Sequence, residues 1–312
     1  MRYYFLVFGV GFFLLAGCNS SPKNQQNPSG IPIIFETDMS TDVDDVGALA
    51  ILHALEGDGK VNILAVCFNE VHKDGAAAID AINTWYGRGN IPIGVYKGKL
   101  VDPHSSKYLT DLATTFPNDI PKVASRIPDA LDVYINTLSG QPDQSVVIIS
   151  VGFLNNLADL LVNHKELVAK KVKKLVLMGG KSADDRTWNI SQHNLMSVSE
   201  KVYREWPTPI VITELGTKVY TGACLEDASW DNPVKMAWYR WFDNKFEGRS
   251  SWDEIAVLYT VYGTDLFNEE WNGSGYWSNG YSYSMKEGLR SYITPKLSNS
   301  EYQTIIDELM MK

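Results

Sequence analysis

Runs of apolar residues without polar alternation recur along this chain, and helical stretches separate them. Strands are predicted at Ile31–Phe35, Val61–Phe68, Ile91–Tyr96, Ser145–Val151, Val172–Met178 and Pro209–Thr213. Helices are predicted at Asp44–Leu55, Ala76–Tyr86, Pro128–Leu138, Leu154–Val162 and Val198–Trp206. Strands that are apolar on both faces and alternate with helices are typical of parallel sheets. The pattern therefore predicts an α/β protein with an open, mostly parallel, Rossmann-like sheet and helices on both of its faces.

The chain changes character after Leu215. Helices are predicted at about Pro233–Phe246, Trp252–Tyr262 and Ser298–Met311, with an aromatic, Gly- and Ser-rich stretch from Trp271 to Tyr283. The 45% of hydrophobic and 21% of charged residues are ordinary for a globular protein. Because the sequence contains no internal repeat, and no low-complexity segment beyond the polar stretch before Ile31, we expect residues 31–312 to form one domain.

The first residues have the layout of an export signal. Arg2 precedes an apolar stretch that ends in small residues and is too short to span a bilayer comfortably. Leu15-Ala16-Gly17-Cys18 resembles the bacterial lipoprotein box, in which the cysteine is lipidated and becomes the new N-terminus. This resemblance implies a signal peptide at 1–17, a lipid on Cys18 and a flexible polar tether at 18–30. We therefore expect an exported protein, anchored by its lipid on the periplasmic or cell-surface side of a bacterial membrane, although a plain secretory signal with a chance cysteine is the alternative.

The net charge of −9 argues against one broad class of partner. Proteins that bind a nucleic-acid backbone present a basic face, and this sequence contains no basic cluster. We therefore expect no nucleic-acid partner.

Acidic residues crowd the junction between the first predicted strand and the first predicted helix, in the segment Glu36-Thr37-Asp38-Met39-Ser40-Thr41-Asp42-Val43-Asp44-Asp45. Open α/β sheets place ligand sites at such strand-to-helix turns. Carboxylates this close together raise one another's pKa, and a chain tolerates that mainly when a cation or a functional proton lies between them. The turn therefore favours a metal-assisted enzyme.

Two known types of acidic site do not fit this spacing. An EF-hand loop that began at Asp42 would place Val46 at its third ligand and His53 where a glutamate is needed. An aspartyl-phosphate enzyme of the haloacid dehalogenase pattern needs its nucleophilic aspartate at the place that Glu36 occupies. Both site types therefore explain the turn poorly.

The segment from Glu36 to Ala50 resembles the signature of the nucleoside hydrolases, the inosine/uridine-preferring ribohydrolase family. That signature is a strand, Asp-x-Asp, a short turn, Asp-Asp and an apolar helix, and the turn is longer here than in the best-known members. The segments that resemble the family's later landmarks, in the same order, are Val147–Ala158, Lys174–Gly180, Thr187–Ile190 and Ser251–Leu258. The resemblance covers about Ile31 to Tyr262 and implies the family's fold, a divergent exported member, and hydrolysis of ribonucleosides to free base and ribose.

The resemblance also implies a metal centre. Asp38, Asp45 and Asp253 would supply carboxylate ligands, and Val151 a backbone carbonyl ligand, to one Ca²⁺, a hard cation that prefers oxygen ligands. Asp38 would also be the general base for the attacking water. An alternative for Asp45 and Asp253 is that each merely favours a helix N-terminus.

The substrate residues implied by the resemblance are Asp44 and Asn189, which would bind ribose hydroxyls, Asn69 as a helper, and Trp252, which would stack on the base. Asn69 could instead be an ordinary loop asparagine, and Asp44 could simply start a helix. Asn194 is the alternative counterpart of Asn189.

Three positions depart from the family's pattern. Glu36 replaces the first aspartate of the signature and adds a methylene, so hydrogen bonds around the ligands can shift. Thr187 stands where the family usually has glutamate. Trp252 stands where many members carry a histidine that protonates the leaving base, and His193 is the nearest candidate to replace it. Loss of that proton donor predicts a slow enzyme or an altered specificity.

These departures leave two alternative functions open. One is a non-catalytic, metal-containing lipoprotein on the same fold that binds a nucleoside or a sugar. The other is a hydrolase of a different ribosyl or glycosyl compound. Because relatives often form dimers or tetramers, the resemblance also implies that a homo-oligomer can form.

Overall fold

The computed structural model describes residues 1, 30–180, 188–270, 274–276, 282–284 and 289–312 of the chain. Apart from Met1, the predicted signal peptide at 1–17 lies outside these described residues, as do the lipidation site Cys18 and all but the last residue of the tether. Thr187 lies outside them as well, as do the side chains of the aromatic stretch from Trp271 to Tyr283.

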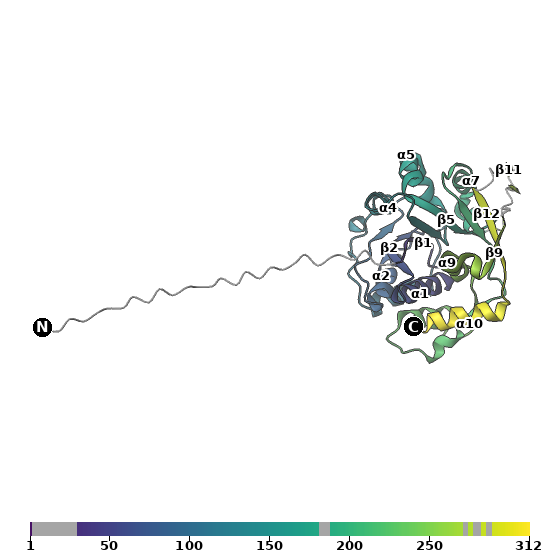
Figure 1. The fold of residues 1–312 in the computed structure, drawn as a ribbon. Coiled ribbons are helices and arrows are strands. Elements are labelled where there is room, and N and C mark those ends of the chain that lie inside the picture. The colour runs from purple at the N-terminus through teal and green to yellow at the C-terminus, as the bar shows by residue number, and fades with distance from the viewer. Residues whose placement is uncertain (2–29, 181–187, 271–273, 277–281, 285–288) are drawn as a thin grey trace.

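An eight-stranded sheet in the order β3-β2-β1-β4-β5-β6-β12-β9 forms the centre of the protein (Figure 1). Its strands are β1 (Ile31–Thr37), β2 (Val61–Phe68), β3 (Ile93–Val95), β4 (Val146–Ser150), β5 (Val172–Met178), β6 (Ile210–Thr213), β9 (Phe267–Glu270) and β12 (Arg290–Pro295). Neighbouring strands run parallel, apart from the antiparallel pair of β12 and β9. The prediction of an open, mostly parallel α/β sheet is thus confirmed.

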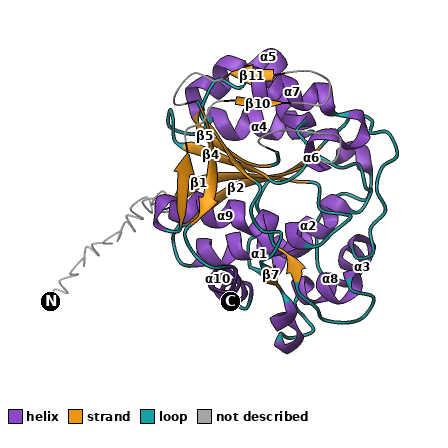
Figure 2. Cartoon of the chain, turned by 90° about the vertical axis from the view of Figure 1, so that its right-hand side faces the viewer, coloured by secondary structure: helices purple, strands orange, loops and turns teal. Residues whose placement is uncertain are grey.

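Helices cover both faces of this sheet (Figure 2). One face carries α1 (Asp44–Gly57), α2 (Gly75–Trp85), α3 (Leu109–Thr115), α8 (Pro233–Trp241), α9 (Trp252–Tyr262) and α10 (Asn299–Met310). The other face carries α4 (Ala130–Ser139), α5 (Asn155–Lys171) and α7 (Met196–Glu205). Each layer buries its own apolar cluster against the sheet, which explains why the central strands read as continuous apolar runs.

Shorter elements connect these layers. They are β7 (Tyr220–Thr221), β8 (Arg249–Ser250), β10 (Ser274–Tyr276), β11 (Ser282–Ser284), α6 (Trp188–Ser191), η1 (Ala124–Arg126), η2 (Gln192–Asn194), η3 (Ala223–Asp227) and η4 (Gly263–Asp265). Within the part of the chain that is described, none of the helices combines the length and the apolar character needed to cross a membrane.

The predicted elements differ from the observed ones mainly at their ends. Helix α5 continues to Lys171, past the predicted end at Val162, with a non-helical residue at His164. Helix α8 ends at Trp241 rather than at Phe246. Helix α3 and the strands β9 and β12 were not predicted, because they are short or lie beyond the regular alternation.

The strand order places the acidic turn at a switch point of the sheet. The chain leaves β1 toward β2 on one side, while β4 pairs with β1 on the other side. Open α/β sheets bind ligands in the crevice at such a point. Gly152 keeps the two strand ends close there, because a Cβ atom at this residue would lie 2.4 Å from the backbone nitrogen of Asp38.

Candidate functional site

The acidic turn folds into a compact carboxylate cluster at the carboxyl end of β1. One carboxylate oxygen from each of Asp42, Asp44 and Asp45 lies within 4.8 Å of the others. Asp44 and Asp45 occupy the first turn of α1, and each is 1% exposed. Asp38 is 7% exposed, which makes it the most accessible of the predicted acidic site residues. The turn therefore directs several carboxylates toward one point.

Helix α9 adds two further buried acids, Asp253 and Glu254. Both oxygens of Asp44, both oxygens of Glu254, Oδ2 of Asp45 and Oδ1 of Asp253 are buried, and none has a hydrogen-bond partner among the residues that the structure describes. The other oxygen of Asp45, Oδ1, accepts a short hydrogen bond from the hydroxyl of Thr37. A buried acceptor without a donor is costly, so this cluster calls for positive charge.

The pKa values of these carboxyl groups also indicate a need for positive charge. Burial is the main reason why the pKa of each of Asp38, Asp45 and Asp253 lies well above its ordinary value. Neighbouring carboxylates raise these pKa values further, with Asp42 acting on Asp38, Asp38 acting on Asp45, and Asp44 acting on Asp253. Such groups hold protons unless a cation takes their place.

A cavity of about 520 Å³ opens over this cluster. Its lining residues are Asp38, Thr41, Asp42, Asp45, Val151, Met178, Gly179, Gly180, Trp188, Asn189, Glu214, Trp241, Arg249, Trp252 and Asp253. The volume lies within the range of about 300–1,000 Å³ that is usual for small-molecule sites. The structure thus brings together the predicted metal residues and two of the predicted substrate residues, Asn189 and Trp252.

Asp44 and Asn69 lie behind the wall of this cavity. Asp44 is near its partners in the cluster, and its Oδ1 is 3.8 Å from Nε of Arg249. Asn69 is fully buried and donates from Nδ2 to the carbonyl oxygen of Phe153 at 2.8 Å and to Glu36 at 3.1 Å. Asn69 therefore positions the loops that carry the site.

Asn189 is placed directly beside the carbonyl that was expected to bind metal. Its Nδ2 donates to the carbonyl oxygen of Val151 at 2.6 Å, and only 3% of the residue is exposed. Because a carbonyl oxygen has two lone pairs, this bond leaves one of them for another partner. Asn194, the alternative counterpart, is exposed and outside the cavity lining.

Glu36, the first departure from the family pattern, is an acceptor buried beneath the cluster. Asn156 donates to its carboxylate at 2.8 Å, and Asn69 and the hydroxyl of Tyr134 donate as well. Burial raises the pKa of Glu36 to about 7, although these donors lower it in part. The extra methylene is thus accommodated by a complete set of donors.

Replacement of Glu36 by alanine is expected to lower the free energy of unfolding by about 3 kcal/mol, because it leaves buried donors unpaired. Glu36→Gln retains an acceptor, so it should lower the free energy of unfolding by less. Between pH 4.5 and 7 the folded wild type holds a proton on Glu36 that the unfolded chain has lost, so its stability falls as pH rises. Urea unfolding across this range should show a flatter pH dependence for Glu36→Gln, and equal slopes would contradict the prediction.

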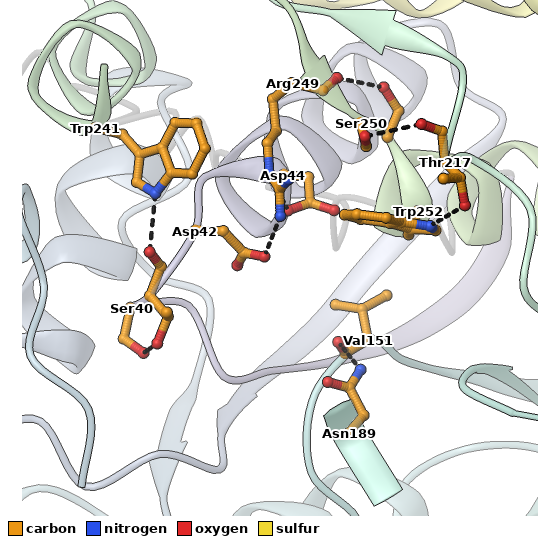
Figure 3. A network of polar contacts seen from close by, with 12 residues as sticks. Ser40, Asp42, Asp44, Val151, Asn189, Thr217, Trp241, Arg249, Ser250 and Trp252 are labelled. Carbon is orange, nitrogen blue, oxygen red and sulfur yellow. Dashed lines mark hydrogen bonds and ion pairs between the residues drawn. The ribbon is translucent and has the colours of Figure 1, made fainter. Parts of the chain in front are cut away.

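Arg249 is a site residue that the sequence analysis missed. Its guanidinium donates to Asp42 at 2.8 Å and lies between the rings of Trp241 and Trp252, at 5.0 and 4.7 Å from their centroids (Figure 3). Asp42 and Arg249 are 207 residues apart in the chain, so no local spacing could have indicated the pair. Of the described residues, it is the one arginine that lines this cavity, and one guanidinium cannot neutralise every carboxylate around it.

Trp252 occupies the position where a histidine was expected, and its indole N–H makes a hydrogen bond within the protein. Nε1 donates to the hydroxyl of Thr217 at 3.0 Å, while the ring faces the cavity (Figure 3). His193, the suggested substitute, points instead toward Glu70, with its Nε2 at 3.5 Å from Oε2. Of the described residues that line the cavity, none is a histidine.

The donor set matches a hard divalent cation. Carboxylates of Asp38, Asp45 and Asp253 and the carbonyl of Val151 line the same cavity, and oxygens of this kind are what Ca²⁺ prefers. The unpaired oxygens of Asp45 and Asp253 are the observation that supports this fit.

Comparisons with known proteins bear on the fold and on the site. A model of the inosine-uridine preferring nucleoside hydrolase family matches residues 33–204. This range includes the acidic turn, Val151 and Asn189 and ends before Arg249 and Asp253. No curated protein sequence matches the chain.

Similar solved structures share the whole architecture. The type III effector XopQ in complex with adenosine diphosphate ribose is 14% identical, with a TM-score of 0.69 over 90% of this chain and 94% of that protein. A plant nucleoside hydrolase is 16% identical, with a TM-score of 0.65 over 91% of this chain and 99% of that protein. A purine-preferring ribonucleoside hydrolase from Gardnerella vaginalis is 16% identical, with a TM-score of 0.65 over 90% and 99%. These likenesses establish the shared fold.

Proposed function

Because this chain belongs to the inosine-uridine preferring nucleoside hydrolase family, we propose that it hydrolyses the N-glycosidic bond of ribonucleosides, giving free base and ribose, with Ca²⁺ as its cofactor. The observation that carries the proposal is the set of unpaired, buried carboxylate oxygens of Asp45 and Asp253 at the cavity that also holds Asp38. A buried cluster of this kind is expensive to maintain without a function.

Asp38, Asp45, Asp253 and the carbonyl of Val151 would hold the ion. When bound, Ca²⁺ would supply the positive charge that keeps these carboxyls ionised and that acidifies a water at the site. Arg249 adds positive charge beside this group, because its guanidinium pairs with Asp42 and lies near Asp44, whose pKa it lowers.

We assign the general base to Asp38. Its carboxylate reaches the cavity, so it can accept a proton from water as the water oxygen bonds to the anomeric carbon. The bond from that carbon to the base nitrogen breaks, and its electron pair leaves with the base. Asn189 at the cavity wall can bind a ribose hydroxyl and so fix the sugar over Asp38.

The leaving group is the point at which a second candidate function arises. The N–H of Trp252 is committed to Thr217, so it does not serve as a proton donor to a departing base. Ribosyl compounds whose leaving group departs without a proton, such as a pyridinium riboside that releases a neutral base, need no such donor. The aromatic rings of Trp188, Trp241 and Trp252 around an acidic cluster would also suit a cationic ring.

A ribose-release assay tests both candidates. Purified protein with Ca²⁺ is incubated with purine and pyrimidine nucleosides, with nicotinamide riboside and with ADP-ribose, the ligand named for the similar effector structure. Turnover of the nucleosides supports the first proposal, and turnover of the pyridinium riboside alone supports the second. Calorimetric binding without any product after long incubation would overturn both and favour a non-catalytic binding protein.

We propose in addition that the mature protein is exported and anchored through a lipid on Cys18. The box Leu15-Ala16-Gly17-Cys18 after an apolar stretch supports this. One acyl chain binds a membrane only marginally, so stable anchoring needs more than one chain. Cys18→Ser is expected to move the protein from the membrane fraction to the soluble fraction of its bacterial host. Equal membrane fractions for Cys18→Ser and wild type would contradict the anchor.

A further inference from the structure

A second group of potential ligands lies outside the set of residues that line the cavity over the carboxylate cluster, although Glu70 is close enough to raise the pKa of Asp38. Glu70 follows β2, His104 lies in the loop after β3, and His193 lies in η2, so three separate segments converge. Nδ1 of His104 and Nε2 of His193 are 3.2 and 3.5 Å from the same oxygen, Oε2 of Glu70. One ligand atom from each of the three residues lies within 4.8 Å of the other two.

The hydrogen bonds of His193 fix the state of its ring. Nδ1 is bonded to the carbonyl oxygen of Val101, and a carbonyl can only accept, so Nδ1 carries the proton. In the neutral ring, Nε2 then presents a lone pair to Oε2 of Glu70, which is also an acceptor. The side chain of His193 is 2% exposed, and its Nε2 has no hydrogen-bond partner within the described part of the chain. Two acceptors face each other, so a positive charge belongs between them.

Protons on both histidines would be a poor source of this positive charge. Nδ1 of His104 lies 3.2 Å from the same carboxylate oxygen but makes no well-aligned hydrogen bond to any described residue. The rings of His104 and His193 are 4.3 Å apart between centroids, so two imidazolium charges would repel each other across one carboxylate. One divalent cation would satisfy both nitrogens and the oxygen together.

The distances suit a tetrahedral ion. Ligands at about 2.0–2.2 Å from Zn²⁺ in tetrahedral geometry lie about 3.3–3.6 Å from one another. The observed separations of 3.2 and 3.5 Å are close to this range. The bond from His193 to Val101 is the kind of outer contact that orients metal-binding histidines. The backbone N–H of Val71 donates to Glu70 Oε1 at 2.7 Å and holds the carboxylate in place.

We propose that Glu70, His104 and His193 bind a transition metal ion of the Zn²⁺ class and leave a fourth position open. Imidazole ligands suit such ions, whereas the all-oxygen cluster at Asp38 suits Ca²⁺. His104 stacks on Trp188 at 5.0 Å between ring centroids, and Trp188 lines the substrate cavity. The ion therefore joins three loops and fixes one wall of that cavity.

Zinc titration of the metal-stripped protein tests this site. The titration is done by competition with a chromophoric chelator while excess Ca²⁺ occupies the carboxylate cluster. We expect one equivalent of Zn²⁺ per chain, and His104→Gln and His193→Gln should each weaken binding by at least about 100-fold. Co²⁺ in place of Zn²⁺ should give the strong visible absorption of a four-coordinate ion.

Matched variants separate this site from other zinc-binding groups. His164→Gln changes a half-buried histidine in α5, outside the three proposed ligands, and should leave zinc affinity unchanged, as should Asp45→Asn in the carboxylate cluster. Circular dichroism checks that each variant is folded. If His193→Gln does not fold, His104→Gln alone provides the test. Absence of tight zinc binding would overturn the proposal, as would equal zinc affinity in the wild type, His104→Gln and His193→Gln. The three residues would then form only a histidine–carboxylate ion pair. The readout is metal affinity, so it does not depend on nucleoside hydrolysis.

Discussion

Asp38→Asn is expected to lower kcat for the best substrate of the assay by about 10²- to 10⁴-fold, the usual contribution of a general base. The amide has nearly the same shape but cannot accept the proton of the attacking water. Because burial raises the pKa of Asp38, the neutral amide should not destabilise the ion-free fold. Steady-state kinetics at saturating Ca²⁺ would show whether the loss lies in kcat rather than in KM.

The matched control for this variant is Asp143→Asn, at a surface aspartate that pairs with Lys171 at 2.8 Å. It makes the same chemical change far from the cavity and should retain the wild-type rate. A rate within a few-fold of wild type for Asp38→Asn would show that another group accepts the proton.

Calcium is expected to stabilise the fold strongly. An ion that binds only the folded state adds about 2.7 kcal/mol at a concentration 100 times its Kd. For a chain of this size, that corresponds to a rise of several degrees in Tm. Thermal unfolding with EDTA and with increasing Ca²⁺ measures the effect, and Asp45→Asn should abolish most of it. A Tm that does not respond to Ca²⁺ would contradict the metal centre.

The pH dependence of the ion-free protein should have a definite sign. Burial and mutual repulsion raise the pKa of Asp44, Asp45 and Asp253 above their ordinary value of 3.8, so the folded state keeps protons that the unfolded chain releases. With EDTA present, the free energy of unfolding should therefore fall as pH rises above about 4. Ca²⁺ should oppose this fall, because it binds the ionised carboxylates.

Much of the site could be predicted because its residues follow strand ends. Asp38 and Val151 come directly after two strands, and the carboxyl ends of parallel strands meet at one edge of a sheet. Asp253 could be placed only through the family resemblance, since nothing local to α9 indicates that it faces the acidic turn.

Other features depend on tertiary contacts that leave no local pattern. Arg249 lies in the two-residue strand β8 and reaches Asp42 only through the fold. Tyr134 and Asn156 reach Glu36 from α4 and α5, on the opposite side of the sheet from α1. Strand β12 joins the sheet between β6 and β9 although the segment before it interrupts the strand–helix alternation.

The distance along the chain between Asp42 and Arg249 also affects how the protein is made. A ribosome adds about 5–20 residues per second. Because Arg249 follows Asp42 by 207 residues, the nascent chain carries the acidic turn for on the order of 10–40 s before Arg249 is synthesised. Asp253 follows only a few residues later. The proposed ion site is therefore complete only near the end of translation, and an unfinished chain has no full cage with which to bind a divalent cation.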